Sequence, residues 1–320
     1  MPHVVVVGRI HPAALDLLRA RPDVTFEEVD EHAPEAIMAA MPRSHGIVVR
    51  TAPITAAMIA TAPQLRAVSK HGVGWDNIDG AALAARGIPL TIAATANMVA
   101  VAEHALFMML ELLKLGREHD RAVREGGWDI RNRFAAGELF RQRLLLLGFG
   151  RIGREVARRA LAFEMTVAVS DPYVAPDLVR AQGCELVSDL DAALAAADVV
   201  SLHLPLTAET RAIIDGGALG RMKPGAILIN TARGGLVDEA ALVRALVDGR
   251  LRGAGLDVFE REPPAADDPL LRAPNLLLSP HSAGVTGAAA IRMGRESVLN
   301  LLAAFDGRLD PGLVVNGVRI

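Results

Sequence analysis

The sequence predicts an α/β protein of two Rossmann-like parallel-sheet domains, a flavodoxin-like domain followed by a Rossmann domain. Apolar, β-rich segments alternate with Ala- and Leu-rich helical stretches along the chain, as in parallel sheets covered by helices. The chain has 320 residues, whereas a single core stops growing at about 250 to 300 residues. A glycine-rich turn near residue 148 opens a second strand and helix series. We therefore expect two domains.

The first series supplies the first domain. Its apolar segments are expected to form strands at residues 3–7, 24–29, 46–50, 66–69 and 88–92. The helical stretches between them lie at residues 12–20, 33–40, 55–61 and 79–86. Such alternation predicts parallel strands joined by helical crossovers.

A long helix over residues 97–124 is expected to link the domains, because apolar residues recur at 101, 105, 108, 109, 112 and 115 before the Gly126-Gly127 break. The second series predicts strands at 143–147, 165–169, 185–187, 198–202, 225–230, 253–257 and 275–279. A last helix, 286–305, should pack back on the first domain. The expected domains are thus 1–97 plus 285–320, and 98–284.

Composition points to small-molecule partners. The net charge is −3 and no block of like charge occurs. We therefore expect neither a stripe of basic residues that binds nucleic acid nor a polybasic patch that binds a membrane. Cys184 is the only cysteine, which excludes an intrachain disulfide and is consistent with a reducing cytoplasm. The N-terminus begins as a strand without the basic start of a signal peptide, and no apolar run reaches membrane-spanning length. No metal site is expected.

The run from Arg143 to Gly153 predicts a dinucleotide site, because an apolar strand leads into G-x-G-x-x-G and then into a helix. Gly148 permits the tight turn, Gly150 lets the backbone approach a pyrophosphate, and Gly153 lets the helix pack on its strand. Asp171 ends the next apolar run, where an acid binds the ribose hydroxyls and favours NAD over a 2′-phosphate. An ordinary glycine turn is the alternative. The turn residues assigned to the cofactor are Gly148, Phe149, Gly150, Arg151, Ile152 and Gly153.

Polar residues that follow strands of the second series are the next candidates, because open α/β sheets bind ligands beyond the carboxyl ends of their strands. Four such exits carry polar side chains. In chain order, the candidates at these four strand exits are His203 and Pro205, then Thr231, Ala232 and Arg233, then Asp257 and Glu262, and finally His281, Ser282 and Gly284. An Arg, an Asp, a Glu and a His would thus gather near one end of the cofactor.

These segments resemble the D-isomer-specific 2-hydroxyacid dehydrogenase family along nearly the whole chain. The matching segments are 71–79, 97–104, 148–153, 202–207, 222–234 and 279–284. The resemblance implies an NAD-binding Rossmann domain, a substrate domain and a cleft between them that closes over substrate. It implies that Arg233, Glu262 and His281 are the catalytic residues. It further implies cofactor contacts by Asp171, His203, Pro205, Thr231, Ala232, Asp257, Ser282 and Gly284.

The three catalytic candidates suit oxidation of a 2-hydroxy acid. Arg233 offers planar, charged donors for the carboxylate. His281 exchanges protons near neutral pH, and Glu262 would favour its imidazolium form and fix its orientation. Plainer interpretations stay open: Arg233 could cap a helix or lie on the surface, His281 could be a loop residue, and Glu262 a surface carboxylate.

Other residues carry similar alternatives. Asp257 could cap a neighbouring turn, and His203 is expected as a wall rather than a catalytic group. Glu103 and His104 could be exposed polar positions of the long helix, and Cys184 is expected to be half-buried and inert.

Substrate specificity should come from the first domain. The turn His71, Gly72, Val73 and Gly74 would present N–H groups to a carboxylate, and Asn97 is a further contact. Arg50 and Lys70 lie where relatives acting on 3-phosphoglycerate carry cations, or they are solvated surface charges. The expected substrate is a short 2-keto acid of the hydroxypyruvate, glyoxylate, 3-phosphoglycerate or sulfolactate type, and Arg50 and Lys70 would suit one with a polar or anionic far end.

Two other functions stay open: a non-enzymatic NAD(H)-sensing protein on the same fold, and a methyltransferase. Formate-type relatives fit Arg50 and Lys70 less well. A homodimer is expected because Leu106, Phe107, Met108, Met109, Leu112 and Leu113 exceed what one intrachain face needs. The sequence ends shortly after Leu313, so a regulatory domain like that of longer phosphoglycerate dehydrogenases is not expected.

Overall fold

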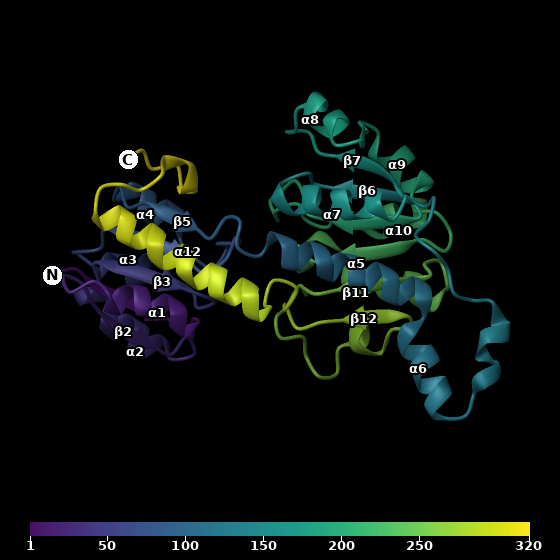
Figure 1. The fold of residues 1–320 in the computed structure, drawn as a ribbon, viewed down its shortest axis with the longest axis horizontal. Helices are drawn as coiled ribbons and strands as arrows, with labels where there is room; N and C mark the ends of the chain where they lie inside the picture. The colour runs from purple at the N-terminus through teal and green to yellow at the C-terminus, as the bar shows by residue number, and fades with distance from the viewer. The chain divides into compact units, whose positions relative to one another are not determined.

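The computed structural model describes residues 1–320 and divides them into two compact units. Unit 1 comprises Met1–Asn97 and Gly284–Ile320, and unit 2 comprises Met98–Ala283 (Figure 1). Both units are parallel α/β sheets, which confirms the expected fold class. The sequence had placed Gly284 in the second domain. In the structure it belongs to unit 1, where a Cβ on Gly284 would lie 2.8 Å from Nδ2 of Asn97.

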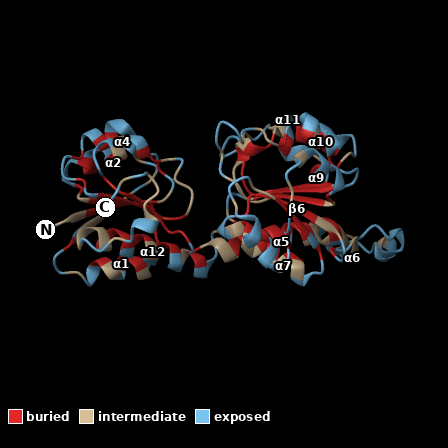
Figure 2. Ribbon diagram, turned by 90° about the horizontal axis from the view of Figure 1, so that it is seen from above, coloured by how far each residue is buried: buried red, intermediate tan, exposed pale blue.

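Unit 1 is built on a five-stranded parallel sheet in the order β2-β1-β3-β4-β5. Its strands are β1 (His3–Val7), β2 (Thr25–Val29), β3 (Gly46–Val49), β4 (Ala67–Lys70) and β5 (Leu90–Ile92). Helices α1 (Pro12–Arg19) and α12 (Gly287–Phe305) cover one face, and α2 (Pro34–Ala40), α3 (Ala56–Ala60) and α4 (Gly80–Ala85) cover the other (Figure 2). Because both faces are covered, the valines of β1 are fully buried.

Unit 2 is built on a seven-stranded parallel sheet in the order β12-β11-β10-β9-β6-β7-β8. The strands are β6 (Arg143–Leu147), β7 (Thr166–Ser170), β8 (Glu185–Leu186), β9 (Val199–Leu202), β10 (Ile227–Asn230), β11 (Gly253–Leu256) and β12 (Leu276–Leu278). The strand order reverses between β6 and β9. Such a switch point is where open α/β sheets bind ligands.

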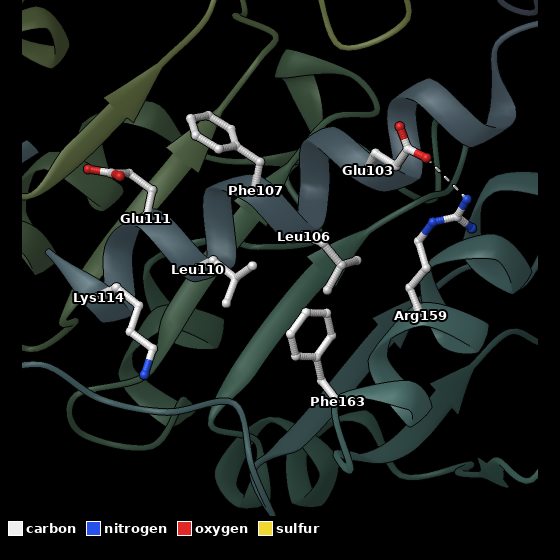
Figure 3. A pocket seen from close by; sticks show the side chains of 8 residues that line it. All are labelled: Glu103, Leu106, Phe107, Leu110, Glu111, Lys114, Arg159 and Phe163. Carbon is white, nitrogen blue, oxygen red and sulfur yellow. Dashed lines mark hydrogen bonds and ion pairs between the residues drawn. The ribbon is translucent and has the colours of Figure 1, made fainter. Parts of the chain in front are cut away.

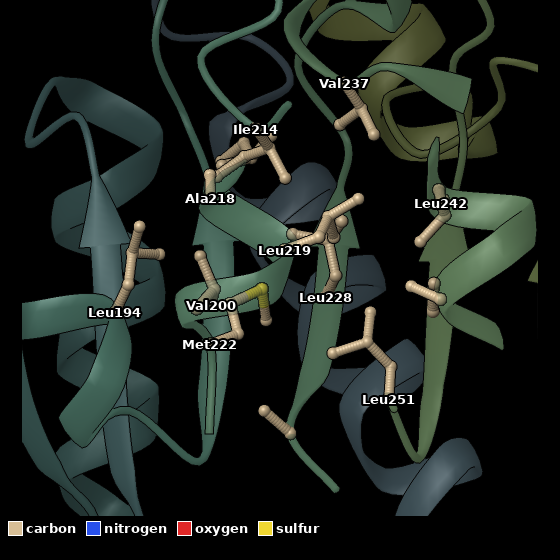
Figure 4. Packing of buried hydrophobic residues seen from close by; sticks show 14 of the residues in the cluster. Leu194, Val200, Ile214, Ala218, Leu219, Met222, Leu228, Val237, Leu242 and Leu251 are labelled. Carbon is tan, nitrogen blue, oxygen red and sulfur yellow. The ribbon is translucent and has the colours of Figure 1, made fainter. Parts of the chain in front are cut away.

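Helices cover both faces of the unit 2 sheet. The helices α5 (Met98–Lys114) and α7 (Arg151–Ala162) pack on one face, with α8 (Pro176–Ala181) at its edge. The other face carries α9 (Leu190–Ala196), α10 (Gly216–Arg221) and α11 (Glu239–Val247). Figure 4 shows leucines of these last helices meeting Val200 and Leu228 of the sheet. This packing fixes the strand ends from which the site is built.

The prediction of a single helix over residues 97–124 is wrong. The helix breaks at Leu115, whose φ is 56°, into α5 and α6 (Gly116–Arg124). The carboxylate of Glu111 accepts a hydrogen bond from the backbone N–H of Arg117 at 2.7 Å, so it caps the start of α6. No residue of α6 is buried, so packing does not hold the two helices in line.

The prediction that α5 carries more apolar residues than packing within the chain requires is also wrong. Leu106, Met108, Met109, Leu112 and Leu113 are at most 7% exposed, and only Phe107, at 51%, faces solvent. Glycines of β11 admit the helix: a Cβ on Gly255 would lie 2.9 Å from Sδ of Met108. The core of unit 2 therefore uses most of these side chains.

One exposed apolar groove remains between α5 and α7. It has a volume of about 520 Å³ and includes Leu106, Phe107, Leu110 and Phe163, with Glu103, Glu111, Lys114 and Arg159 around them (Figure 3). No helix of the chain combines the length and apolar character needed to cross a bilayer.

Candidate active site

The glycine turn after β6 is packed as a dinucleotide turn requires. Gly148 has a φ of 96°, and a Cβ there would lie 2.5 Å from the carbonyl oxygen of His203. A Cβ on Gly153 would lie 2.4 Å from the carbonyl oxygen of Gly148. These contacts bring β6, α7 and the end of β9 together. By contrast, no atom lies within 4 Å of the Cβ position of Gly150, so the backbone there is open to a ligand.

The N-terminus of α7 begins at this open glycine. Gly150 is its N-cap and no side chain accepts a hydrogen bond from the first turn of the helix. The helix is 12 residues long and carries no acidic residue in its first turn. Uncapped N–H groups and a positive helix end suit a phosphate. The turn therefore fits the pyrophosphate of NAD.

Asp171 lies beside the turn at the end of β7. Its Oδ2 accepts a hydrogen bond from the backbone N–H of Phe149 at 2.8 Å, and its Oδ1 accepts one from Tyr173 at 2.9 Å. The carboxylate is thus held at the carboxyl edge of the sheet, next to the glycines. This is the position at which an acid meets the ribose of NAD.

His203 forms a wall of the turn rather than a proton donor. Its backbone N–H donates to the carbonyl of Leu147 at 2.7 Å, and its Nε2 is 2.8 Å from Oγ of Ser201. Burial lowers the pKa of His203 to about 3, so the ring is neutral near pH 7. Pro205 follows in the same loop, where its carbonyl accepts a hydrogen bond from Thr210 at 2.7 Å.

The loop after β10 presents Arg233. The buried side chain of Asn230 binds two adjacent residues of this loop, donating to the carbonyl of Arg233 at 2.8 Å and accepting from Ala232 N–H at 3.0 Å. Sequence reasoning missed Asn230, although a polar residue ending a buried strand is a usable signal. Thr231 Oγ1 is buried without a hydrogen-bond partner, and buried polar atoms without a partner are uncommon in native proteins.

Gly234 brings the Arg233 loop against the segment that follows β11. A Cβ on Gly234 would lie 1.9 Å from the carbonyl carbon of Phe259, so no other residue fits there. The positive charge of Arg233 accordingly acts on Glu262, three residues beyond Phe259.

Glu262 and His281 form a hydrogen-bonded pair, with Oε2 2.7 Å from Nδ1. The other carboxylate oxygen of Glu262 accepts the backbone N–H of Phe259 at 3.0 Å. Burial acts to raise the pKa of Glu262, but the hydrogen bonds from His281 and Phe259 outweigh it, so the pKa is lowered. Glu262 is therefore ionised near neutral pH and orients the imidazole.

Asp257 holds the turn that carries His281. Its carboxylate is 1% exposed and accepts hydrogen bonds from Ser279 Oγ at 2.5 Å, Ser282 N–H at 2.8 Å and Ala283 N–H at 2.9 Å. Within the chain, Asp257 therefore caps the turn at residues 279–283, as the alternative interpretation of the sequence allowed. Both carboxylate oxygens are engaged inside unit 2.

His104 extends this network onto α5. Its Nε2 lies 2.9 Å from Oγ of Ser279, so it is not the exposed polar position allowed for by the sequence, and only 21% of its side chain is exposed. Ser279 was missed as well. Glu103, in contrast, is exposed and makes only a 3.5 Å ion pair with Arg159.

In unit 1, the turn after β4 carries the predicted substrate residues. His71 and Gly72 are buried, and Val73 and Gly74 are partly exposed. Burial, together with the charge of Arg50, lowers the pKa of His71 to about 4. Nε2 of His71 and Oδ1 of Asn97 are both buried without hydrogen-bond partners. Three predicted site residues therefore hold orphaned polar atoms, the third being Thr231.

The two predicted cations of unit 1 are used inside the protein. Lys70 is only 7% exposed, and its Nζ donates to the carbonyl of Arg50 and to Oδ1 of Asn77 at 3.0 Å. Arg50 Nη1 donates to Oε1 of Glu31 at 2.9 Å. Lys70 is therefore not a solvated surface charge and supports a loop, whereas Arg50 is ion-paired and keeps 36% of its side chain exposed.

Comparison with known proteins identifies the family. Residues 106–283 match the model of the D-isomer specific 2-hydroxyacid dehydrogenase, NAD binding domain. The chain is 39% identical over 315 residues to a D-3-phosphoglycerate dehydrogenase of Mycobacterium tuberculosis, covering 98% of this chain and 59% of that protein. It is 40% identical over 267 residues to a glyoxylate reductase of Korarchaeum cryptofilum, covering 82% of this chain and 80% of that one.

A solved structure agrees with these relatives. D-lactate dehydrogenase from Aquifex aeolicus, complexed with NAD and lactic acid, superposes with a TM-score of 0.87 at 31% identity, covering 98% of this chain and 99% of that one. The chain spans 59% of the length of the first curated relatives. The resemblance inferred from the motifs is confirmed: the chain belongs to the D-isomer specific 2-hydroxyacid dehydrogenase family.

Proposed function

We propose that this chain is an NAD-dependent dehydrogenase that interconverts a short 2-hydroxy acid and its 2-keto acid. The observation that carries the proposal is the 2.7 Å contact between His281 and Glu262 in the unit that holds the glycine turn. A histidine with a carboxylate on one nitrogen has its other nitrogen available for proton transfer. NAD bound at the turn supplies the hydride chemistry.

Arg233 and His281 divide the work on the substrate. Arg233 binds the substrate carboxylate through its planar, permanently charged guanidinium. Nε2 of His281 takes the hydroxyl proton as the C–H hydrogen leaves as hydride, and returns a proton to the carbonyl oxygen in the reverse direction. Glu262 keeps the ring oriented through its 2.7 Å contact with Nδ1. Asp257, through the turn 279–283, holds His281 in place.

We assign substrate recognition to the first unit as well. The turn from His71 to Gly74 follows a strand end, where its N–H groups suit a carboxylate. The orphaned atoms of His71 and Asn97 support a ligand there. The substrate class is a short 2-keto acid such as glyoxylate or hydroxypyruvate, in keeping with the glyoxylate reductase named above.

The test measures NADH consumption by the purified chain with glyoxylate, pyruvate, hydroxypyruvate and phosphohydroxypyruvate. We expect turnover with at least one acid and a loss of roughly 100- to 10,000-fold in His281→Asn, the range for removal of a general acid–base. NADH affinity should be retained in that variant. His32→Asn, at an exposed histidine, is the control. Tight NADH binding with no turnover of any acid would instead support the NAD(H)-sensing alternative.

A homodimer is part of this proposal. It rests on the apolar groove between α5 and α7, where Phe107 is 51% and Phe163 is 44% exposed, since paired exposed aromatics mark association surfaces. Size-exclusion chromatography of Phe107→Glu against the unchanged chain tests it: the variant should elute as a monomer, and a monomeric unchanged chain would contradict the dimer.

A further inference from the structure

The carboxyl ends of β2 and β3 form a corner in which unit 1 binds its own carboxylate. Glu31, just beyond β2, reaches across Gly8 to Arg50 and Thr51, which follow β3. Its Oε1 accepts from Nη1 of Arg50 at 2.9 Å. Its Oε2 accepts from the hydroxyl of Thr51 and from the backbone N–H of Thr51 at 3.3 Å.

These donors make up an anion site. A guanidinium, a backbone N–H and a hydroxyl converge on one carboxylate, and charge-assisted bonds of this kind are the strong ones. Only 9% of the Glu31 side chain is exposed. Gly8 makes the approach possible: its φ is 92°, and a Cβ there would lie 2.7 Å from Oε2 of Glu31. The corner is therefore filled from within the chain.

The corner adjoins the turn that we assign to substrate recognition. His71 N–H donates to the carbonyl of Val49 at 2.8 Å, which links the ends of β3 and β4. The charges of Arg50 and Glu31 both act on the His71 ring. A second cation, Lys70, donates to the carbonyl of Arg50 and to Asn77. A substrate group extending from the turn toward this corner meets a guanidinium that is already ion-paired with Glu31.

We propose that Glu31 is a specificity-determining residue that makes this corner reject a second anion, so that the substrate is a short 2-keto acid whose far end is uncharged. The inference rests on the proposed function. A phosphate or sulfonate entering the corner would face the carboxylate, and like charges brought together repel. Displacing Glu31 would break its bonds to Arg50 and Thr51. A hydroxymethyl group or a hydrogen atom carries neither penalty.

The test compares hydroxypyruvate with phosphohydroxypyruvate, which differ only by the phosphate group. The unchanged chain should show a kcat/KM at least tenfold higher for hydroxypyruvate. Glu31→Ala frees the guanidinium and the Thr51 donors, so its preference should shift at least tenfold toward phosphohydroxypyruvate. Glu31→Gln, which keeps the shape and removes the charge, should shift it in the same direction and guards against misfolding of the alanine variant.

Glu27 provides the matched control. It lies on β2 and its Oε1 pairs with Nε of Arg43 at 2.7 Å, so Glu27→Ala removes a nearby glutamate–arginine ion pair without touching the corner. Its substrate preference should equal that of the unchanged chain. A preference of the unchanged chain for phosphohydroxypyruvate, or an unaltered preference in both Glu31 variants, overturns the inference. Failure of the proposed function looks different, because no keto acid would then be consumed by any form.

Discussion

Oε2 of Glu262 lies 2.7 Å from Nδ1 of His281, a residue held in the left-handed region with a φ of 52°. A carboxylate bonded to Nδ1 fixes the orientation of the ring and leaves Nε2 for proton transfer. Glu262→Gln should therefore lower kcat for keto-acid reduction by about tenfold or more, while the NADH dissociation constant stays within about twofold. Steady-state kinetics with an NADH titration check this, and an unchanged kcat would mean that Glu262 does not position His281.

Substitutions of two glycines of the turn should have different effects: Gly150→Ala should weaken cofactor binding, and Gly153→Ala should lower stability. Gly150 has open space around its Cβ position and a φ of −69°, so Gly150→Ala should fold normally yet bind NADH at least about tenfold more weakly. Gly153→Ala forces a methyl group onto the Gly148 carbonyl and should cost about 1 to 3 kcal/mol of stability. Thermal melting and NADH fluorescence titration distinguish the two. Equal melting losses would contradict the assignment of Gly150 to the ligand side.

Asp171 should set the choice between NADH and NADPH. Its carboxylate would repel the 2′-phosphate of NADPH, so Asp171→Asn should raise the ratio of NADPH to NADH kcat/KM by about tenfold or more. NADH affinity should fall somewhat, because the hydrogen bonds to Phe149 and Tyr173 N–H are disturbed. Asp177→Asn on α8, with a side chain 93% exposed, serves as control. An unchanged ratio would place the ribose elsewhere.

The network from His104 to Asp257 should matter more to turnover than to cofactor binding. Ser279→Ala breaks the bridge between them, leaving the turn of His281 less fixed, so kcat should fall while the NADH dissociation constant stays within about twofold. Asp257→Asn should also cost about 1 to 3 kcal/mol of stability, as a buried acceptor is lost. Ser44→Ala removes a comparable buried serine bond in unit 1 and should leave kcat unchanged. Equal kcat in Ser279→Ala would refute the positioning role.

The lowered pKa values of two histidines predict acid sensitivity. Burial lowers the pKa of His203 to about 3, and burial with the charge of Arg50 lowers that of His71 to about 4. Unfolded histidines titrate near about 6.5, so the unfolded chain binds more protons below that pH. Stability should therefore be full above pH 6.5 and should fall as the pH drops from there toward 4. Urea unfolding at several pH values, with His71→Asn expected to flatten the decline, measures this.

The strands and the glycine turn were predictable because their signals are local. An apolar run that ends in G-x-G-x-x-G predicts both the strand and the turn. Strand β6 begins and ends at the expected residues, Arg143 and Leu147. The hydrogen bond between Glu262 and His281 could not be predicted from spacing alone, because the two residues lie on loops that follow different strands. The resemblance to the family is what indicated that they act together.

Lys70 shows why the rest could not be predicted. Arg50 and Lys70 both follow apolar strands, which suggested that their charges face a ligand. The partners of Lys70 are the Arg50 carbonyl and Asn77, and Glu31 comes from yet another strand end. No periodicity encodes such contacts. Similarly, the apolar residues of α5 looked surplus because nothing local reveals that glycines of β11 let the helix approach the sheet so closely.

The return of α12 to the first unit has a consequence for how the chain is made. This helix buries Val298, Leu301 and Leu302 against the unit 1 sheet, and a Cβ on Gly46 of β3 would lie 2.6 Å from Phe305. During synthesis the first 97 residues leave the ribosome long before this helix exists, so one face of their sheet is covered by α1 alone. Unit 2, formed by the uninterrupted stretch Met98–Ala283, has all its own parts earlier. Domains fold as units during translation, so the segment made first is the one whose folding is completed last.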